Sequence, residues 1–424
     1  MKKIFISIIA ILAFVNVNAQ FKVSAEFRPR FEFRSGYKDV MLDSLYPAYF
    51  VSQRSRINFD IVKEQYEARL SVQDVRVWGD EAAGTSIGSI GIYEAWFKLY
   101  FLQNFSLKAG RQTLIYDDEN LLSNSNWGQK ALKHDALLLG YKKDNFLGDF
   151  AFSLNNTSEK SVGSEYPTTY PKMMSFLYLK KTVNDNFYIS AIALANAYQK
   201  DKSPNTIYVT GTYGAYSVYD SKKLLLKFYG YYQNGSNVKG KKVSAFLLTG
   251  EAGIKTPKLE FSVGAEYVSG NNVFNTNADY QAVEHNFELV YNSKHKFNGY
   301  IDYFTNIPKA TSFAGLIDIY PRIVLNINDK AKFSTDYHYF MQANPIADAL
   351  DPTKEANKFL AHEVDFVFDY KFNKSTALQI GYLFILPSET MLSIKKIDTG
   401  MEKFSQFAYV MLTFKPEFFN SENK

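Results

Sequence analysis

The residues from Phe21 to Arg34 alternate apolar and polar side chains almost without a break. Because successive side chains of a β-strand point to opposite faces, a period of two predicts a strand with one apolar face. That apolar face is mainly aromatic, and the same alternation returns at 54–61 and 66–72. The opposite face of the first segment carries Lys22, Glu26, Arg28, Arg30, Glu32 and Arg34. One aromatic face and one densely charged face imply lipid on one side of the sheet and water on the other.

The arginines are concentrated in the first part of the chain, whereas the lysines are spread along it. Eight of the nine arginines are Arg28, Arg30, Arg34, Arg54, Arg56, Arg69, Arg76 and Arg111. An arginine that faces lipid at mid-membrane costs about 2–4 kcal/mol, so several of them would cancel a typical folding stability of about 5–15 kcal/mol. We therefore expect these guanidinium groups to face a wet interior, where their planar donor forks can bind carboxylates.

Residues 1–19 have the features of a secretory signal peptide. Lys2-Lys3 precede a short apolar run, and Val17-Asn18-Ala19 form a small-residue cleavage site. We expect cleavage after Ala19, so that residues 20–424 form a single domain. The chain has no cysteine, which excludes disulfides and thiolate sites, and no later apolar run is long enough for a membrane-spanning helix. An exported chain with 17% aromatic residues and no helical span predicts a β-barrel in the cell outer membrane.

Alternating segments continue to the C-terminus and predict an all-β fold, a transmembrane antiparallel up-and-down β-barrel. The segmentation gives about twenty strands, or eighteen if two weak segments merge, so we expect an even number of about 18 (16–20). The segments 283–293 and 297–306 are among the expected strands. Short turns alternate with longer polar loops, and Trp127 beside Asn124–Asn126 predicts that the loop 116–133 folds over or into the mouth of the barrel.

Over about residues 21–141 the sequence resembles the alginate export family of outer-membrane β-barrels. The resemblance rests on the run Arg28–Arg34 and on Ser52-Gln53-Arg54-Ser55-Arg56, Gln73-Asp74-Val75-Arg76-Val77-Trp78-Gly79, Glu94-Ala95-Trp96, Gly110-Arg111-Gln112, Tyr116-Asp117-Asp118, Trp127 and His134-Asp135-Ala136-Leu137. It implies an eighteen-stranded barrel whose Arg- and Lys-lined conduit passes a polyuronate.

We therefore expect an outer-membrane channel that conducts an anionic polysaccharide or oligosaccharide, such as an alginate-like polyuronate. Arginines at two-residue spacing along a strand offer carboxylate sites about 7 Å apart. Arg111 alternates in phase with Phe105 and Leu107, which places it on the apolar face. We therefore expect either a β-bulge that turns Arg111 to the inner face or a position of Arg111 at the rim of the barrel. The expected conduit residues are Arg28, Arg30, Arg34, Arg54, Arg56, Arg69, Arg76, Lys98, Arg111 and Lys133.

The expected partners are outer-membrane lipid and an anionic saccharide or other anionic solute, and the sequence leaves periplasmic export partners open. No nucleic acid and no cofactor are expected. An enzyme is not expected either, because the five histidines show no metal-ligand spacing and no serine partner, so we assign no catalytic or metal residue.

Two other functions stay open at this point. In a general or anion-selective diffusion porin, the arginines would mainly brace the wall against the acidic residues Glu26, Glu32, Asp60, Glu67, Asp74 and Glu94. The far wall of such a porin would be acidic, with Asp302, Asp318, Asp336, Glu363, Asp365 and Asp369. A structural or adhesive barrel is the minor alternative.

Overall fold

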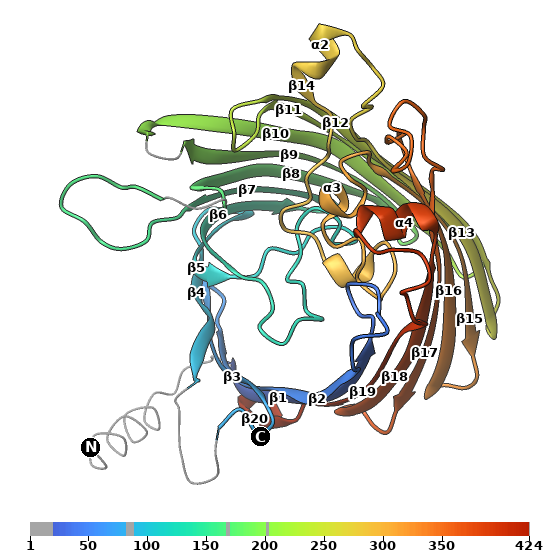
Figure 1. The fold of residues 1–424 in the computed structure, drawn as a ribbon. Helices are drawn as coiled ribbons and strands as arrows, with labels where there is room; N and C mark the ends of the chain where they lie inside the picture. The colour runs from blue at the N-terminus through green and yellow to red at the C-terminus, as the bar shows by residue number, and fades with distance from the viewer. Residues whose placement is uncertain (1–19, 82–88, 167–169, 201–202, 424) are drawn as a thin grey trace.

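The chain forms a closed antiparallel β-barrel, seen along its axis in Figure 1. The computed structural model describes residues 20–81, 89–166, 170–200 and 203–423, so the expected signal peptide lies outside the described residues. Eighteen strands of this described part make up the barrel. They are β1 (Gln20–Ser35), β2 (Ala48–Val62), β3 (Tyr66–Val77), β4 (Gly91–Tyr100), β5 (Phe105–Gln112), β6 (His134–Lys143), β7 (Phe146–Leu154), β8 (Met173–Asn184), β9 (Phe187–Lys200), β10 (Ser203–Asp220), β11 (Leu224–Ser236), β12 (Lys242–Lys255), β13 (Leu259–Val268), β15 (Leu316–Asn326), β16 (Ala331–Gln342), β17 (Phe359–Lys371), β18 (Thr376–Pro387) and β19 (Ser405–Phe414).

The barrel closes where β1 pairs with β19. Phe27 lies opposite Phe414 and Ser35 opposite Gln406, while the first part of β1 pairs with a short strand, β20 (Glu417–Asn420). In hydrocarbon each unpaired backbone group costs several kcal/mol, so a sheet can cross a membrane only if it has no free edge. Closure with eighteen strands confirms the predicted fold class and the even strand number.

Two expected strands are wrong, because the chain from 269 to 315 is one long connection between β13 and β15. Within 283–293, only β14 (Val283–Glu284) is a strand, and it lies parallel to β12; no strand falls within 297–306. The connection also contains α2 (Ala278–Gln281), the 3₁₀ turn η1 (Lys294–Lys296) and α3 (Ile307–Ala310). Much of this segment runs inside the barrel (Figure 1). Two further short helices are α4 (Glu389–Ile394) and η2 (Ser421–Asn423).

The two faces of the barrel have opposite chemistry, as the alternation predicts. Phe27, Phe31 and Ile57 are exposed on the outer face, whereas Arg28 and Arg54, their neighbours on the same strands, are buried on the inner face. In the described part of the chain, no helix is both long enough and apolar enough to cross a membrane.

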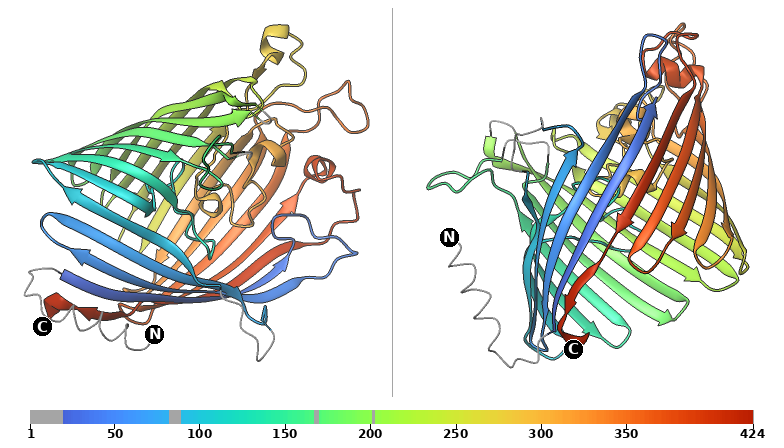
Figure 2. Two further views of the ribbon diagram at one scale, coloured as in Figure 1. Left: turned by 90° about the vertical axis from the view of Figure 1, so that its left-hand side faces the viewer. Right: turned by 90° about the horizontal axis from the view of Figure 1, so that it is seen from below.

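The barrel has two different ends, and the strands run at a slant between them (Figure 2). Short turns join the strands at one end, and the longer loops, with α2 and α4, lie at the other. Gln20 pairs with Val62 beside a short turn, so β1 begins at the short-turn end. In outer-membrane barrels the short turns face the periplasm and the long loops face outward.

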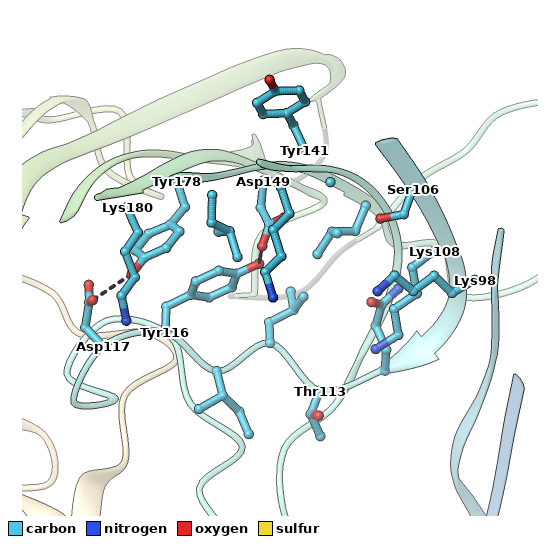
Figure 3. A pocket seen from close by; sticks show the side chains of 17 residues that line it. Lys98, Ser106, Lys108, Thr113, Tyr116, Asp117, Tyr141, Asp149, Tyr178 and Lys180 are labelled. Atoms are coloured by element: carbon cyan, nitrogen blue, oxygen red, sulfur yellow. Dashed lines mark hydrogen bonds between the residues drawn. The ribbon is translucent and has the colours of Figure 1, made fainter. Parts of the chain in front are cut away.

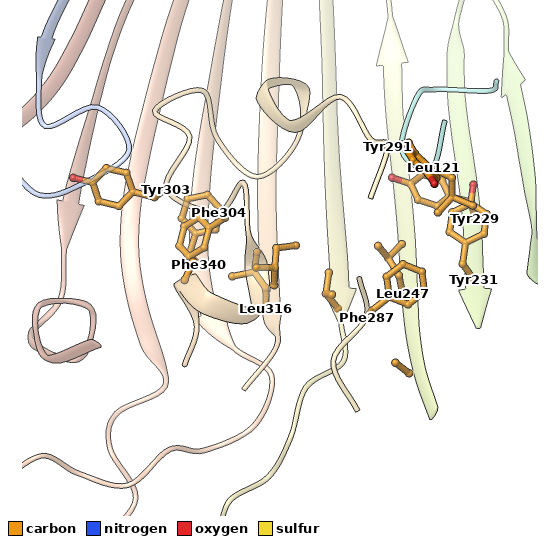
Figure 4. Close-up of a cluster of buried hydrophobic side chains, with 14 of the residues drawn as sticks. Leu121, Tyr229, Tyr231, Leu247, Phe287, Tyr291, Tyr303, Phe304, Leu316 and Phe340 are labelled. Atoms are coloured by element: carbon orange, nitrogen blue, oxygen red, sulfur yellow. The ribbon is translucent and has the colours of Figure 1, made fainter. Parts of the chain in front are cut away.

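The apolar core of this protein lies inside the barrel, where an ordinary porin lumen holds water (Figure 4). Phe304, from the connection 269–315, packs on Phe340 of β16 with ring centroids 4.3 Å apart. Phe287 of the same connection is buried in the cluster that includes Leu247 of β12 and Leu316 of β15. The inward part of the connection is therefore a packed structural element.

The outer face predicts a stability difference between two arginine substitutions. Leu139 lies in the middle of β6 on the outer face, so Leu139→Arg should destabilise the barrel in lipid vesicles by about 2–4 kcal/mol. Leu45 lies outside the strands and is 51% exposed, so Leu45→Arg should change the stability by less than about 0.5 kcal/mol. Urea unfolding in vesicles measures both, and equal effects would mean that Leu139 does not face lipid.

Candidate functional site

The first inward loop, residues 113–133, enters the lumen between β5 and β6 (Figure 1). Its two ends meet, because Gln112 and His134 lie directly opposite each other in the sheet. Sharp bends at Asp117 and Ser125, both with positive φ, turn the chain back within the lumen. The prediction that the loop 116–133 folds into the barrel is confirmed.

The first inward loop caps the arginine-rich wall. Arg28 donates to the carbonyl oxygen of Asn126 over 2.9 Å and to Oε1 of Gln129 over 3.0 Å. Arg54 donates to the side chain of Asn126 over 2.8 Å and to Glu26 over 2.9 Å. The side chains of Arg28 and Arg54 are 5% and 0% exposed. These two guanidinium groups thus hold the loop and are covered by it.

A stack of planar groups lies inside the barrel against the wall of β1 and β19. The guanidinium carbon of Arg30 lies 3.8 Å from the centroid of the Trp127 ring, and its Nη1 donates to the Trp127 carbonyl over 2.8 Å. On Trp127 the ring of His295 stacks at 3.7 Å and 9°. Tyr409 of β19 meets the indole edge-on. The large aromatic residue in a polar loop was the sequence signal for this contact.

The second inward loop, residues 285–315, binds the acidic wall of β15–β17. Only β18 and β19 separate this wall from β1, so the expectation that the acidic residues form the far wall is wrong. The backbone N–H of Tyr300 donates to Asp365 over 3.1 Å. Its neighbour Ile301 donates its N–H to Glu363 over 2.8 Å. The acidic wall therefore accepts hydrogen bonds from backbone N–H groups, whereas the arginine wall donates to backbone carbonyls.

The predicted acidic set differs from the structure at one residue, Asp302. The other members lie on β15–β17, but Asp302 belongs to the second inward loop, because the expected strand 297–306 does not form. Its carboxylate accepts from His295 over 2.8 Å and from the Tyr37 hydroxyl. Burial alone would raise the pKa of Asp302, but the attraction of His295 and these hydrogen bonds lower it below 3.8.

Two other predicted conduit arginines are half-exposed and ion-paired on the inner wall. Arg34 donates to Glu32 over 2.6 Å, and Arg69 binds Asp60 over 2.6 Å. The prediction for Arg76 is wrong. It pairs with Gln53 in the same phase as the exposed Leu70, so it lies on the outer face near the loop end of β3. There it binds Asp74 over 2.7 Å. Arg56, which is buried, donates to Gln73 over 2.8 Å and lies 3.5 Å above the ring of Tyr93.

Arg111 is placed differently from the expectation for a conduit residue. It lies on the outer face at the end of β5 and pairs with Asp135 over 2.9 Å, and both side chains are well exposed. No bulge shifts the phase of β5, which pairs in continuous register with β6 from Phe105 to Gln112. Arg111 therefore belongs to the rim and does not line the lumen.

The two predicted lysines lie in different places. Lys133 ends the first inward loop, and burial, with Arg111 and Lys130 nearby, lowers the pKa of its ammonium group. Lys98 is on the inner face of β4, directly opposite Lys108 of β5. Sequence reasoning missed Lys108 and Lys180, although both fall on the polar phase of their strands. Among the described residues, no group of acidic or histidine side chains is arranged to hold a metal ion.

Comparison with known proteins gives one family. The family model described as alginate export matches residues 17–392. No curated protein matches the sequence.

Several solved barrels share the fold. OccK9 (OpdG) of Pseudomonas aeruginosa superposes with a TM-score of 0.62 at 11% identity, covering 94% of this chain and 98% of that one. OccAB1 of Acinetobacter baumannii gives a TM-score of 0.62 at 12% identity, covering 94% and 97%. OccD3 (OpdP) of P. aeruginosa gives 0.60 at 10% identity, covering 94% and 92%.

The contacts of the first inward loop predict that it limits the lumen. Because Gln112 and His134 are cross-strand neighbours, Asn-Gly can replace residues 113–133 as a two-residue hairpin turn. This variant should conduct ions better than the wild type in planar bilayers. Deletion of residues 350–353, which include the almost fully exposed Leu350, removes the exposed ion pair of Asp351 with Lys354. This deletion is the control and should leave the conductance unchanged. Equal conductance of all three proteins would mean that the loop does not obstruct the pore.

The Asp302 contacts predict a pH dependence of the second inward loop. A carboxyl group whose pKa is lowered on folding stabilises the folded state above its ordinary pKa, and this contribution is lost as the pH falls through the lowered value. Asp302→Asn should therefore increase the current fluctuations of the channel near pH 7. The difference from the wild type should vanish well below pH 3.8. Asp39→Asn, at an exposed carboxylate of the neighbouring loop, should behave like the wild type. A difference that persists at low pH would contradict this role of Asp302.

Proposed function

Since the chain belongs to the alginate export family, whose members are outer-membrane barrel channels, we propose that it conducts an anionic polysaccharide or oligosaccharide across the outer membrane. The solute we infer is a polyuronate of the alginate kind. Export after removal of a signal peptide at Ala19 is part of this proposal. So is contact with periplasmic export partners at the short-turn end.

The observation that carries the proposal is the set of acceptors around Arg28. This guanidinium is held by a backbone carbonyl and a side-chain amide of the first inward loop. Its nearest carboxylate contact, to Glu26, is longer, at 3.8 Å. A hydrogen bond from arginine to a carboxylate is roughly twice as strong as one to a neutral acceptor. A uronate chain therefore competes with the loop for the same donors, and in doing so it would loosen the loop.

Further arginines near Arg28 offer donors to carboxylates along the same wall. Arg30 and Arg54 face the same side of the lumen, and Arg34 and Arg69 keep part of their surface open beside their acidic partners. Several weak sites in sequence allow a charged chain to bind and still leave, as conduction requires. Low-dielectric walls strengthen the field that such a row of cations creates.

A general or anion-selective diffusion porin is the second candidate. This function is favoured by the ion pairs of Arg34 and Arg69 on the inner wall, since arginines held by fixed carboxylates brace a wall as well as they bind a solute. The acidic wall of β15–β17, which β18 and β19 separate from β1, gives the lumen sectors of opposite charge, as in a porin constriction. A structural or adhesive barrel remains the minor alternative.

Planar-bilayer recording of the refolded mature protein tests the proposal. In a salt gradient the reversal potential should show anion preference. Alginate trimers should then block the current, and maltotriose, a neutral trimer, should not. Block by neither sugar, with weak selectivity, would favour the diffusion porin. Absence of any conductance, in the wild type and in the Asn-Gly variant alike, would favour the structural barrel.

A further inference from the structure

A cavity of about 450 Å³ lies in the lumen beside the first inward loop (Figure 3). Residues Thr113–Asp117 of the loop form one side of it. Its other walls come from the inner faces of β4–β8, near the short turns that join these strands. The cavity therefore lies between the loop and the short-turn end of the barrel.

Cations outnumber anions in the lining of this cavity. Four lysines, Lys98, Lys108, Lys142 and Lys180, face two aspartates, Asp117 and Asp149. Figure 3 shows Lys98 and Lys108 on one side of the cavity and Lys180 on the other.

Both aspartates are already engaged by tyrosine hydroxyl groups. Tyr116 donates to Asp149 over 2.9 Å, and Tyr178 donates to Asp117 over 2.7 Å. In the described part of the chain, neither carboxylate forms an ion pair with a lysine of the cavity. The two aspartates attract the lysines electrostatically, but the lysines outnumber them, so the lining of the cavity keeps a net positive charge.

Lys98 and Lys108 are an unfavourable pair in the absence of an anion. They lie directly opposite each other on neighbouring strands, and like charges in such cross-strand pairs destabilise a sheet. Each ammonium group rests on an aromatic ring, Lys98 on Tyr100 at 4.6 Å and Lys108 on Trp96 at 4.0 Å. Such contacts place a cation but leave its charge available to a ligand.

Lys180 completes the arrangement from the far side. Its ammonium nitrogen lies 3.5 Å from the ring centroid of Tyr188, again without an ion pair in the described residues. The apolar side chains Leu114, Leu138 and Leu147 line the same cavity as the two groups of lysines. A ligand with carboxylates on successive units and apolar C–H faces between them matches this distribution.

We propose that this cavity is a binding site for a segment of a uronate chain, with Lys98 and Lys108 holding one carboxylate and Lys180 holding the next. This inference rests on the proposed function and adds a location to it. The site lies on the short-turn side of the first inward loop, so an anionic chain that comes from the periplasm meets it before it meets Arg28.

Equilibrium binding to the refolded protein in detergent tests the site directly. Alginate trimers are titrated into the wild type and into the Lys98→Gln/Lys108→Gln variant by calorimetry. Loss of two charged donors should weaken the affinity for the trimer by about tenfold or more. Removing two opposed like charges should not harm folding, which the circular dichroism spectrum of the variant verifies.

The matched control removes the same charge at the same end of the barrel. Lys222→Gln/Lys223→Gln changes two exposed lysines of the turn between β10 and β11, outside the cavity, and should bind the trimer like the wild type. Equal weakening in both variants would overturn the site, because it would show a diffuse effect of net charge. A trimer that binds no better than inorganic phosphate would also overturn it, because the site would then not recognise a saccharide.

The test separates the failure of the site from the failure of the channel function. If alginate trimers block the wild-type current and the Lys98→Gln/Lys108→Gln variant binds them with unchanged affinity, the site is wrong and the proposed function stands. If the wild type neither binds the trimers nor is blocked by them, both are wrong.

Discussion

The need to pair every backbone N–H and C=O group in hydrocarbon governs this structure. It requires a sheet without edges, and the pairing of β1 with β19 provides one. A closed sheet in lipid must turn its apolar side chains outward, so its charged side chains are forced together inside. Those charges need partners, and in this chain the barrel's own loops supply many of them. The inward loops thus follow from a wall that carries its charged side chains on the inside, whether or not they also obstruct a solute.

The two inward loops bind the arginine wall and the acidic wall through different backbone groups, C=O in the first loop and N–H in the second. Carbonyl oxygens of the first loop accept from Arg28 and Arg30, and N–H groups of the second loop donate to Glu363 and Asp365. A buried charge costs less free energy when hydrogen bonds satisfy it, so neutral peptide groups stabilise both walls without adding net charge. The contact of Trp127 with His295 joins the loops to each other. A solute that displaces one inward loop therefore disturbs a connected structure and not a single side chain.

The barrel fold could be predicted from the sequence, but the candidate site could be predicted only in part. The alternation of apolar and polar residues shows which side chains face lipid, and this is enough to predict a barrel. It also misleads at 283–306, because apolar residues there, such as Phe287 and Ile301, are buried by packing inside the barrel and not by facing lipid from a strand. Burial of Arg28 and Arg54 by a loop about a hundred residues further on leaves no local pattern at all. Lys108 could have been found, since a hairpin with a short turn after Lys98 brings the two residues together.

The seam between β1 and β19 joins segments from the two ends of the chain, with Phe33 opposite Ala408. Contacts between such distant residues form slowly, because the whole intervening chain must first be brought into place. Until then the first and last strands are open edges, which readily pair with other chains. Until β19 pairs with β1, an assembling barrel therefore exposes two edge strands that can pair with those of other copies of the chain. During this period the two edges must be shielded from other molecules.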